Sequence, residues 1–342
     1  AKEVFELAFA DDRGRVVERK RLSRRAFARA LEQRPPLRVL MEACGSAHYW
    51  ARRFQCQGHA VRLLPARDVR PYVRGNKTDR NDVAGILEAD RCGDIAGVPV
   101  KTPEQQGIQA LHRLREHLKA ERTATINLLR GVLREFGVTI PAGALKVPAA
   151  VRDALEDGDN ELPMPLRYSL DDQLQRLAQL QADMAAIEQR LEEFADRDVA
   201  VQRYRRVPGV GLLTATALRA SAGDLSRFRN GRQFAAWLGL TPREHSSGQQ
   251  RRLGGLTKRG DVYLRTLLVH GARAVLTAAR LKQRRGQPLD PLQAWALKVQ
   301  DARGHNKAAC ALANKLARRL WAMEHHGQAF DPRHVSQRPG AH

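Results

Sequence analysis

The sequence predicts an α/β domain at the N-terminus, followed by a longer region built mainly from helices. Over roughly the first hundred residues, short apolar runs alternate with helix-forming segments. Beyond Pro103, apolar residues recur at intervals of three and four, as they do along the buried face of a helix. The chain has 342 residues, more than one hydrophobic core usually organises, so we expect two or three domains.

The α/β pattern begins with a β-hairpin. Residues 4–10 and 15–18 are extended in character and are separated by the turn Asp11-Asp12-Arg13-Gly14. The elements expected next are a helix capped by Ser23 and ending near Gln33, a buried strand over 37–41 followed by Glu42, a helix over 46–57 and a strand over 61–64.

Long helices follow, interrupted by a break over residues 137–165 that is rich in Gly and Pro. After the break, six apolar residues step by 3, 4, 3, 4 and 3, namely Leu177, Leu180, Met184, Ile187, Leu191 and Phe194. This spacing is typical of coiled coils. It has two interpretations: a helical hairpin packed on its own chain, or an intermolecular coiled coil that assembles a dimer or a tetramer.

Positive charge dominates the chain but is unevenly distributed. The 59 Lys and Arg against 37 Asp and Glu give a net charge of +22. Residues 1–151 carry +11 and residues 199–342 carry +19, whereas residues 152–198 carry −8. The excess points to a polyanionic partner, with nucleic acid as the leading candidate. The acidic segment is a candidate for protein–protein contact.

The same composition disfavours several function classes. The four cysteines show neither CxxC spacing nor the density of a secreted disulfide scaffold, so we expect a reducing cytosol and no zinc finger. No apolar stretch approaches the roughly 18 residues of a membrane span. The basic residues are spread through globular helices, so a membrane partner is not expected.

Three carboxylates are candidate metal ligands. Lys77-Thr78-Asp79-Arg80-Asn81-Asp82 opens a helical pattern, in which residues three apart lie close together, so Asp79 and Asp82 can converge. A divalent cation would remove their repulsion and use their oxygens as ligands. Glu42 stands at the end of an apolar strand, where open sheets present functional groups. The alternative is structural, because Asp at a helix N-terminus complements the helix dipole.

A glycine-containing turn is a candidate for phosphate contact. Val207-Pro208-Gly209-Val210-Gly211 lies between two helical runs, like the hairpin of a helix–hairpin–helix element. Gly209 and Gly211 would let backbone amides and the next helix N-terminus approach a phosphate. The flanking cations are Arg203, Arg205 and Arg206. A plain turn between helices is the alternative interpretation.

A loop that contains Ser246, Ser247 and Gly248 is surrounded in sequence by Arg243, Arg251, Arg252, Lys258 and Arg259. A serine in such a loop is usually a turn former, and the adjacent His245 does not establish a catalytic arrangement. Dense positive charge beside a phosphate would nevertheless favour attack by a hydroxyl group. The residues alone leave both interpretations open.

In their order and separations, these motifs resemble the DEDD-type insertion-sequence transposases that work as bridge-RNA-guided recombinases. The resemblance covers residues 1 to about 330 and rests on Glu42, residues 77–82, Pro208-Gly209-Val210-Gly211, residues 239–243, Ser247-Gly248 and Lys258-Arg259-Gly260. It implies a RuvC-like, ribonuclease-H-fold domain over residues 1–102, and long helices with an assembling coiled coil over 103–200. It further implies a helical transposase domain with a helix–hairpin–helix-like element over 201–331, and a tail over 332–342.

The resemblance also implies roles for single residues. Glu42, Asp79 and Asp82 match the family's second, third and fourth acids, which bind Mg²⁺, and Ser247 matches the nucleophile because the family's serine precedes a glycine. The first aspartate lies two residues before an Ala-Lys pair in the family, so we expect it to precede Ala1. The expected nucleic-acid contacts are Lys77, Arg80, Arg203, Arg205, Arg206, Gly209, Gly211, Arg243, Arg251, Arg252, Lys258 and Arg259.

The predicted function is RNA-guided recombination, in which DNA is cleaved and rejoined through a serine-linked intermediate. The expected partners are donor and target DNA, a structured bridge RNA and further copies of the chain, in a bacterial or archaeal cytoplasm at the nucleoid. A junction-resolving or repair nuclease is the first alternative. Such an enzyme would activate water and form no covalent complex with DNA. A non-catalytic nucleic-acid-binding protein is the second, and it would show steep salt dependence without cleavage.

Overall fold

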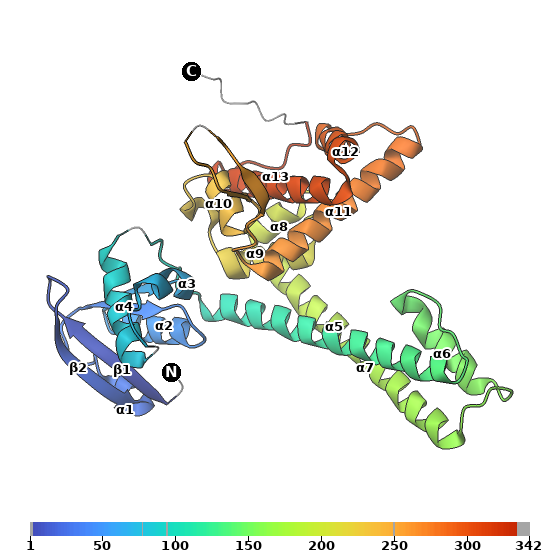
Figure 1. The fold of residues 1–342 in the computed structure, drawn as a ribbon, viewed down its shortest axis with the longest axis horizontal. Coiled ribbons are helices and arrows are strands. Elements are labelled where there is room, and N and C mark those ends of the chain that lie inside the picture. Colours follow the sequence, from blue (N-terminus) through green and yellow to red (C-terminus); the bar gives the residue numbers. More distant parts are fainter. Residues whose placement is uncertain (1–2, 77, 94, 249, 334–342) are drawn as a thin grey trace. The chain divides into compact units, whose positions relative to one another are not determined.

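The computed structural model describes residues 3–76, 78–93, 95–248 and 250–333. The chain divides into two units, residues 1–104 and residues 105–342, each with hydrophobic clusters of its own (Figure 1). The further division near residue 200 stays a prediction. Lys77 and residues 334–342 of the expected tail lie outside the described residues.

The N-terminal unit contains the predicted hairpin and the predicted alternation of strands and helices. Strand β1 (Val4–Ala10) pairs antiparallel with β2 (Val16–Ser23), and β3 (Arg38–Glu42) pairs parallel with β4 (Ala60–Leu64). The helices are α1 (Arg24–Arg29), α2 (Ala47–Cys56), α3 (Ala66–Val69), the 3-10 helix η1 (Arg70–Tyr72) and α4 (Asp79–Arg91). Helix α1 is shorter than predicted, because the chain continues into turns before Gln33.

An aromatic cluster holds the hairpin, α1 and α2 together. The rings of Phe5 and Phe27 stack with 4.2 Å between their centroids, and Trp50 and Phe54 pack edge-on against Phe27. The predicted cap is confirmed, because Ser23 Oγ accepts a hydrogen bond from the Ala26 amide. Over the part of the chain that is described, β1–β2 and β3–β4 are separate two-stranded sheets, so a continuous ribonuclease-H-type sheet stays a prediction.

Two long helices form an antiparallel hairpin in the C-terminal unit (Figure 1). They are α5 (Pro103–Glu135) and α7 (Met164–Arg197). The predicted Gly- and Pro-rich break contains the 3-10 helix η2 (Ala144–Lys146) and helix α6 (Val147–Glu156), which the sequence reasoning missed. Val147 and Val151 of α6 are fully buried in the cluster that α5 and α7 share.

The heptad residues are covered by their own chain. Leu177, Leu180, Met184, Ile187 and Leu191 are each no more than 7% exposed within a single chain. Leu177 packs with α5 and α6, and Leu191 packs with α5 and α9. Within one chain, these residues therefore fit the interpretation as an intrachain hairpin, and an intermolecular coiled coil stays a prediction. Assembly into a dimer or tetramer likewise stays a prediction.

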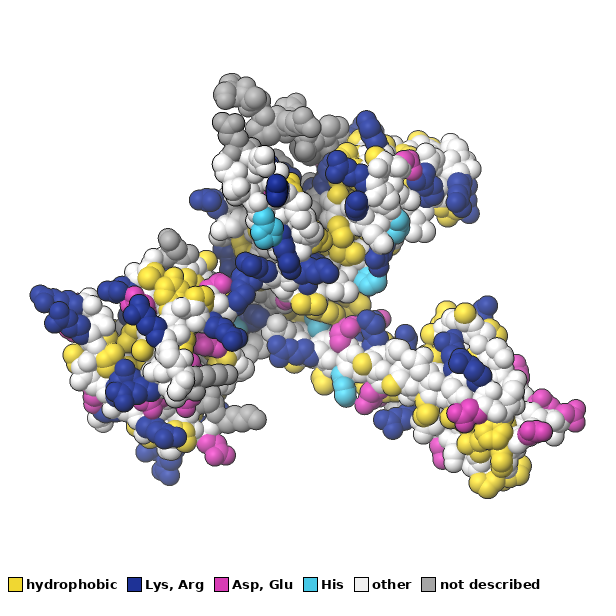
Figure 2. All heavy atoms as spheres, in the orientation of Figure 1, with side chains coloured by type: hydrophobic (Ala, Val, Ile, Leu, Met, Phe, Trp, Pro, Cys, Tyr) yellow, Lys and Arg dark blue, Asp and Glu magenta, His cyan; other side chains and the backbone are white. Residues whose placement is uncertain are grey.

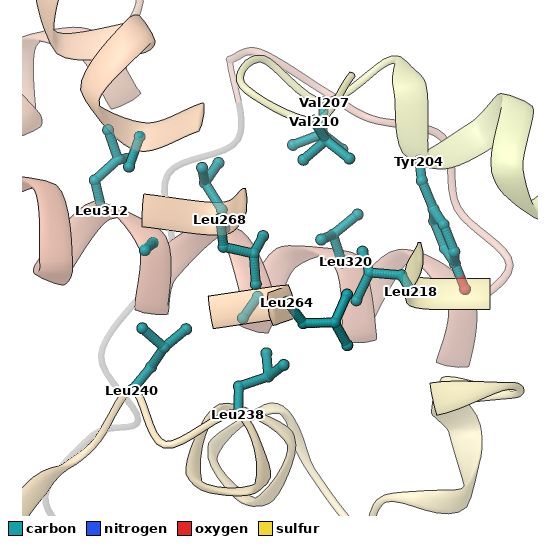
Figure 3. Packing of buried hydrophobic residues seen from close by; sticks show 14 of the residues in the cluster. Tyr204, Val207, Val210, Leu218, Leu238, Leu240, Leu264, Leu268, Leu312 and Leu320 are labelled. Atoms are coloured by element: carbon teal, nitrogen blue, oxygen red, sulfur yellow. The ribbon is translucent and has the colours of Figure 1, made fainter. Parts of the chain in front are cut away.

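A helical body follows the long hairpin. It comprises α8 (Val199–Arg205), α9 (Leu212–Ala222), η3 (Leu225–Arg227), α10 (Gly231–Trp237), the hairpin of β5 (Pro242–Glu244) and β6 (Leu253–Leu256), α11 (Val262–Arg284), α12 (Pro291–Arg303) and α13 (His305–His325). Helix α13 packs against α10, α11 and α12. Figure 3 shows Leu312 and Leu320 of α13 in one cluster with Leu264 and Leu268 of α11. Within the described ranges, no helix is both long and apolar enough to cross a bilayer.

The turn between α8 and α9 docks on α11 through two glycines. Gly209 has a φ of +82°, and a Cβ built on it would lie 2.7 Å from the carbonyl oxygen of Gly271. A Cβ on Gly271 would lie 1.9 Å from the carbonyl oxygen of Gly209. The two backbones are therefore in direct contact, and a side chain at either position would force them apart.

Gly271→Ala should lower the free energy of unfolding by about 1 to 3 kcal/mol, because the added methyl group must displace the backbone of Gly209. Gly131→Ala is the matched control, since Gly131 also lies inside a helix but a Cβ there meets nothing within 4 Å. The control should be stabilised by about 0.5 to 1 kcal/mol. Urea denaturation followed by circular dichroism measures both, and equal effects would contradict the contact.

Candidate functional site

The predicted serine loop is the tip of the β5–β6 hairpin. The two strands pair antiparallel, with Pro242 opposite Leu256. At the tip, the Ser247 amide donates to the Gln250 carbonyl at 3.3 Å, and the Gln250 amide donates back at 3.1 Å. Gly248 has a φ of +56°, a conformation that favours glycine. Ser247 is thereby held, exposed, at the end of a closed turn.

The base of this hairpin is fixed by a second contact between backbones. Gly239 has a φ of +70°, and a Cβ there would lie 2.8 Å from the Gly260 nitrogen. A Cβ on Gly260 would lie 2.1 Å from the carbonyl oxygen of Trp237. The Thr257 amide also donates to the Thr241 carbonyl at 2.8 Å. Gly239, before the hairpin, and Gly260, after it, therefore hold the two arms of the hairpin together between the end of α10 and the start of α11.

Ser246 and Ser247 differ in what their hydroxyl groups contact. Ser246 Oγ donates to Glu244 Oε1 at 2.8 Å and accepts from the Arg252 amide at 3.2 Å. The bond from Ser246, together with one from Arg251, holds the pKa of Glu244 below its usual value. The Ser247 hydroxyl has no hydrogen-bond partner among the residues that the structure describes. Ser246 therefore braces the hairpin, while the Ser247 hydroxyl is free to meet a substrate.

Five of the predicted nucleic-acid contacts lie on or beside this hairpin. All five are exposed, and they are Arg243, Arg251, Arg252, Lys258 and Arg259. Lys258 has a φ of +54°, which makes it the one non-glycine residue with a left-handed backbone in the described chain. Such a conformation is unfavourable for a residue with a side chain and is often found at functional sites. A phosphate that approaches Ser247 thus enters a field of positive charge.

The glycines of the predicted helix–hairpin–helix element have different surroundings. Gly209 makes the backbone contact with Gly271, so its conformation serves packing within the chain. Gly211 is exposed at the N-terminus of α9, and a Cβ there would meet nothing within 4 Å. Of the three flanking arginines, Arg205 pairs with Glu192 of α7, Arg203 is half-buried and Arg206 is exposed. Phosphate binding at this turn stays a prediction.

The predicted acids lie at the ends of two elements of the N-terminal unit. Glu42 is the last residue of β3, and Asp79 and Asp82 lie in the first turn of α4, where Thr78 Oγ1 accepts from the Asn81 amide at 3.2 Å. Arg80 is exposed beside them. Over the described ranges, no three His, Cys, Asp or Glu side chains gather into a group that could hold a metal ion. The structure therefore does not assemble a Mg²⁺ site from these three carboxylates.

An ion-pair cluster that the sequence reasoning missed fixes the other end of α4. The Asp90 side chain is 8% exposed and contacts Arg38 Nη2 at 2.6 Å, and it also pairs with Arg62. These arginines lie on β3 and β4, and Arg38 begins β3. The C-terminal end of α4 is thus held beside the start of β3. Asp79 and Asp82 lie at the other, N-terminal end of α4.

Comparison with known proteins identifies the family. Residues 1–138 match the DEDD transposase model of the IS110 group, and residues 201–286 match the model described as Transposase IS116/IS110/IS902 family. The chain belongs to the IS110 transposase family. The first match contains Glu42, Asp79 and Asp82, and the second contains Ser247.

Relatives match the transposase along nearly its whole length. A probable family 20 transposase of Pseudomonas aeruginosa is 44% identical over 324 residues, which are 94% of each chain. The transposase for insertion sequence element IS1111A of Coxiella burnetii is 38% identical over 94% of this chain and 87% of its own. The transposase for insertion sequence element IS1328 of Yersinia enterocolitica is 36% identical over 96% of each chain.

A buried polar network lies next to the base of the serine hairpin in this transposase. His112 of α5 is 3% exposed, and its ring nitrogens hydrogen-bond to the Tyr263 hydroxyl and the Thr216 hydroxyl, both at 3.0 Å. Burial, with a smaller effect from Arg115, lowers the pKa of His112 to about 4, and burial raises the pKa of Tyr263 to about 12. Both groups are therefore neutral at pH 7, and they join α5 and α9 to the first turn of α11.

The neutral state of His112 predicts a loss of stability in acid. The unfolded histidine takes up a proton near pH 6.5, whereas the folded one does so only near pH 4. The free energy of unfolding should therefore fall as the pH drops through this window, by on the order of 3 kcal/mol, with no further contribution below it.

His112→Asn removes this contribution, so its urea-denaturation midpoint should depend less steeply on pH than that of the wild type between pH 6.5 and 4. His270→Asn, at an exposed position, should retain the wild-type dependence. The same pH dependence in the wild type and His112→Asn would show that His112 is not responsible.

Proposed function

We propose that this transposase cleaves and rejoins DNA through a covalent bond between Ser247 and a DNA phosphate, with an RNA supplying the sequence address. Membership of the transposase family supports an enzyme that acts on DNA. The observation that carries the serine assignment is the contrast at the hairpin tip. The Ser246 hydroxyl is bound to Glu244, whereas the exposed Ser247 hydroxyl has no partner among the described residues.

The covalent step exchanges one phosphoester bond for another. Ser247 Oγ attacks phosphorus, so that an Oγ–P bond forms and the bond from phosphorus to one deoxyribose oxygen breaks. That oxygen leaves with the electron pair and takes up a proton, while the serine proton passes to solvent or to a base. The products are a phosphoserine ester and a free sugar hydroxyl. Attack by the hydroxyl of another DNA end reverses the step and joins new partners.

The cations around Ser247 contribute electrostatically to this step. Arg243 lies on β5, and Arg251 and Arg252 lie in the turn that leads into β6. Charge on the phosphate oxygens increases as the hydroxyl attacks, so fixed guanidinium groups stabilise the transition state more than the ground state. Arg251 is already oriented by its bond to Glu244 at 3.1 Å, which reduces the reorganisation needed when a phosphate arrives.

Recognition of sequence is assigned to base pairing by RNA. Exposed arginines and lysines bind phosphates and position a duplex, but they do not distinguish bases. In the proposed function, a structured bridge RNA pairs with donor and target DNA, and the protein holds the backbones of both. The net charge of +22 fits a chain that binds two polyanions. The proposed setting is the nucleoid of a bacterial or archaeal cytoplasm.

We also propose that Glu42, Asp79 and Asp82 are ligands of Mg²⁺ in the assembled complex. Because the described residues contain no assembled metal site, further oxygen ligands must join these three. A fourth acid and a DNA phosphate are groups of suitable chemistry. A site that combines the acids of one copy with Ser247 of another would make cleavage depend on assembly into a dimer or tetramer.

Ser247→Ala should abolish formation of a covalent protein–DNA complex, because no other hydroxyl occupies its position. The measurement uses end-labelled donor DNA, the full-length protein and the element's RNA, with products separated on a denaturing gel. Ser246→Ala is the matched control, since it removes a hydroxyl one residue away and should keep at least part of the adduct.

Each arm of this experiment tests one part of the proposal. An undiminished adduct in Ser247→Ala would reject the nucleophile, and cleavage without any adduct would favour the nuclease alternative. Treatment with ribonuclease before DNA is added should remove the adduct, and adding the RNA back should restore it. Adduct formation unaffected by ribonuclease would reject guidance by RNA.

Asp79→Asn and Asp82→Asn together should weaken binding of Mn²⁺, used as a paramagnetic substitute for Mg²⁺, at least tenfold in the DNA-bound complex, because two anionic ligands are lost. Electron paramagnetic resonance of free Mn²⁺ measures this without relying on activity. Asp11→Asn with Asp12→Asn, in the exposed turn between β1 and β2, gives the matched control. Equal Mn²⁺ binding by the two double variants would contradict the ligand assignment.

A further inference from the structure

A groove runs along the helical body beside the serine hairpin. Its walls come from the start of α10, the base of β5–β6, α12 and α13. Its volume of about 1710 Å³ exceeds the roughly 300 to 1,000 Å³ of sites that enclose small molecules. The groove therefore has room for part of a macromolecule.

The side chains that line this groove are strongly basic. The cations are Arg232, Arg303, Lys307, Lys315, Arg318 and Arg319, and Asp331 is the one carboxylate in the lining that the structure describes. None of these cations belongs to the residues that the sequence singled out. Figure 2 shows Lys and Arg side chains gathered over the C-terminal helices. The occupant should therefore be an anion of extended form.

Most of these cations lack a carboxylate partner. No ion pair with a described residue joins Arg232, Arg303, Lys307, Lys315 or Arg318. Elsewhere in the same unit such pairs occur, for example between Arg219 and Asp198 at 2.8 Å. The unpaired charges repel one another, and a bound polyanion would remove that repulsion.

The spacing of residues on α13 explains how the groove forms. Lys307, Ala311, Lys315 and Arg318 follow each other by four, four and three residues, so they share one face of the helix. Leu312, Leu316 and Leu320 occupy the opposite, fully buried face. Small side chains such as Ala311 leave the groove open between the longer cationic ones.

The aromatic residues in the lining are already engaged within the protein. Lys315 Nζ lies 4.0 Å from the centre of the Trp295 ring. Trp321 Nε1 donates to the Phe228 carbonyl at 2.8 Å, and its ring stacks on His325. Because these rings do not stand free in the groove, the lining favours a phosphate backbone over stacked bases.

The groove is continuous with the hairpin that carries Ser247. Pro242 of β5 and Gly254 and Leu256 of β6 form part of its lining. Asn314 of α13 donates to the Leu240 carbonyl at 3.1 Å, which ties the start of the hairpin to the groove wall. A strand that passes the hairpin can therefore continue along α13 without leaving the basic surface.

We propose that this groove binds the sugar–phosphate backbone of the DNA that flanks the phosphodiester presented to Ser247. The choice of DNA rests on the proposed function, because the groove adjoins the hairpin that acts on DNA. Binding at this surface would be independent of base sequence, and it would fix the register of the strand relative to Ser247.

The test compares two double variants of the full-length protein, freed of nucleic acid by high-salt chromatography. Lys307→Gln with Arg318→Gln removes two groove charges. Lys298→Gln with Arg284→Gln removes one lysine and one arginine from exposed positions outside the groove, so net charge is matched. Fluorescence anisotropy gives the affinity for a labelled 30-base-pair donor DNA from 50 to 300 mM KCl.

The groove variant should bind this DNA at least tenfold more weakly at 0.1 M KCl, and the slope of log K against log salt should become shallower by about 2, one unit per lost phosphate contact. The control should stay within about twofold of the wild type. Lys307→Arg with Arg318→Lys, which keeps both charges, should retain binding. Equal losses in the groove and control variants would overturn the proposal, since net charge alone would then explain the effect.

Two further arms separate the other possible occupants. If the groove variant loses affinity for the bridge RNA but not for DNA, or loses self-association in sedimentation while DNA binding is unchanged, the groove serves RNA or a second copy and the proposal fails. The Ser247 adduct is scored separately on saturating DNA. An absent adduct in the wild type would reject the proposed function, whereas normal DNA affinity in the groove variant would reject only the groove.

Discussion

The serine hairpin and the α8–α9 turn, two surfaces predicted to contact nucleic acid, depend on two contacts in which backbone touches backbone. Gly239 and Gly260 bring together the two arms of the serine hairpin, and Gly209 and Gly271 hold the α8–α9 turn on α11. A Cβ at any of these positions would meet an atom within 2.8 Å, so glycine is required for close packing at both contacts. Since α11 follows Gly260 and contains Gly271, a shift of this helix would move the hairpin and the turn together.

The distribution of paired and unpaired charge gives these surfaces a common character. Several cations in the scaffold have carboxylate partners, such as Arg115 with Glu188 at 2.6 Å along the long hairpin. Among the groove cations, by contrast, no ion pair with a described residue joins Arg232, Arg303, Lys307, Lys315 or Arg318. In general, surfaces of this kind bind phosphate backbones without regard to sequence and with an affinity that depends on salt. Under the proposed function, base pairing with RNA supplies the sequence information that such a surface does not read.

Sequence reasoning succeeded where the information is local and failed where it depends on distant partners. The Ser23 cap, the first hairpin and the β3–β4 strands follow from residues a few positions apart. The heptad spacing revealed an apolar stripe on α7 but not which helix covers it, because period alone carries no partner identity. Likewise, the spacing of Asp79 and Asp82 indicates proximity to each other, but convergence with Glu42 depends on tertiary structure. The groove was missed because Arg232 and Arg318 are far apart in the chain.

A nucleophile at the tip of a hairpin, the role proposed for Ser247, would suit a substrate whose reactive bond lies on the outside of a wide duplex. An exposed hydroxyl can reach a phosphodiester without the DNA entering a pocket, but it lacks the desolvated surroundings that usually activate a serine. Activation must then come with the substrate, from phosphate-bound cations and from groups that other parts of the assembly supply. The three predicted acids and Ser247 lie in different units of the chain. In the proposed function, a reactive centre that combines them would form in the assembled complex. Under this proposal, a lone protomer could bind DNA through its basic surfaces without cleaving it.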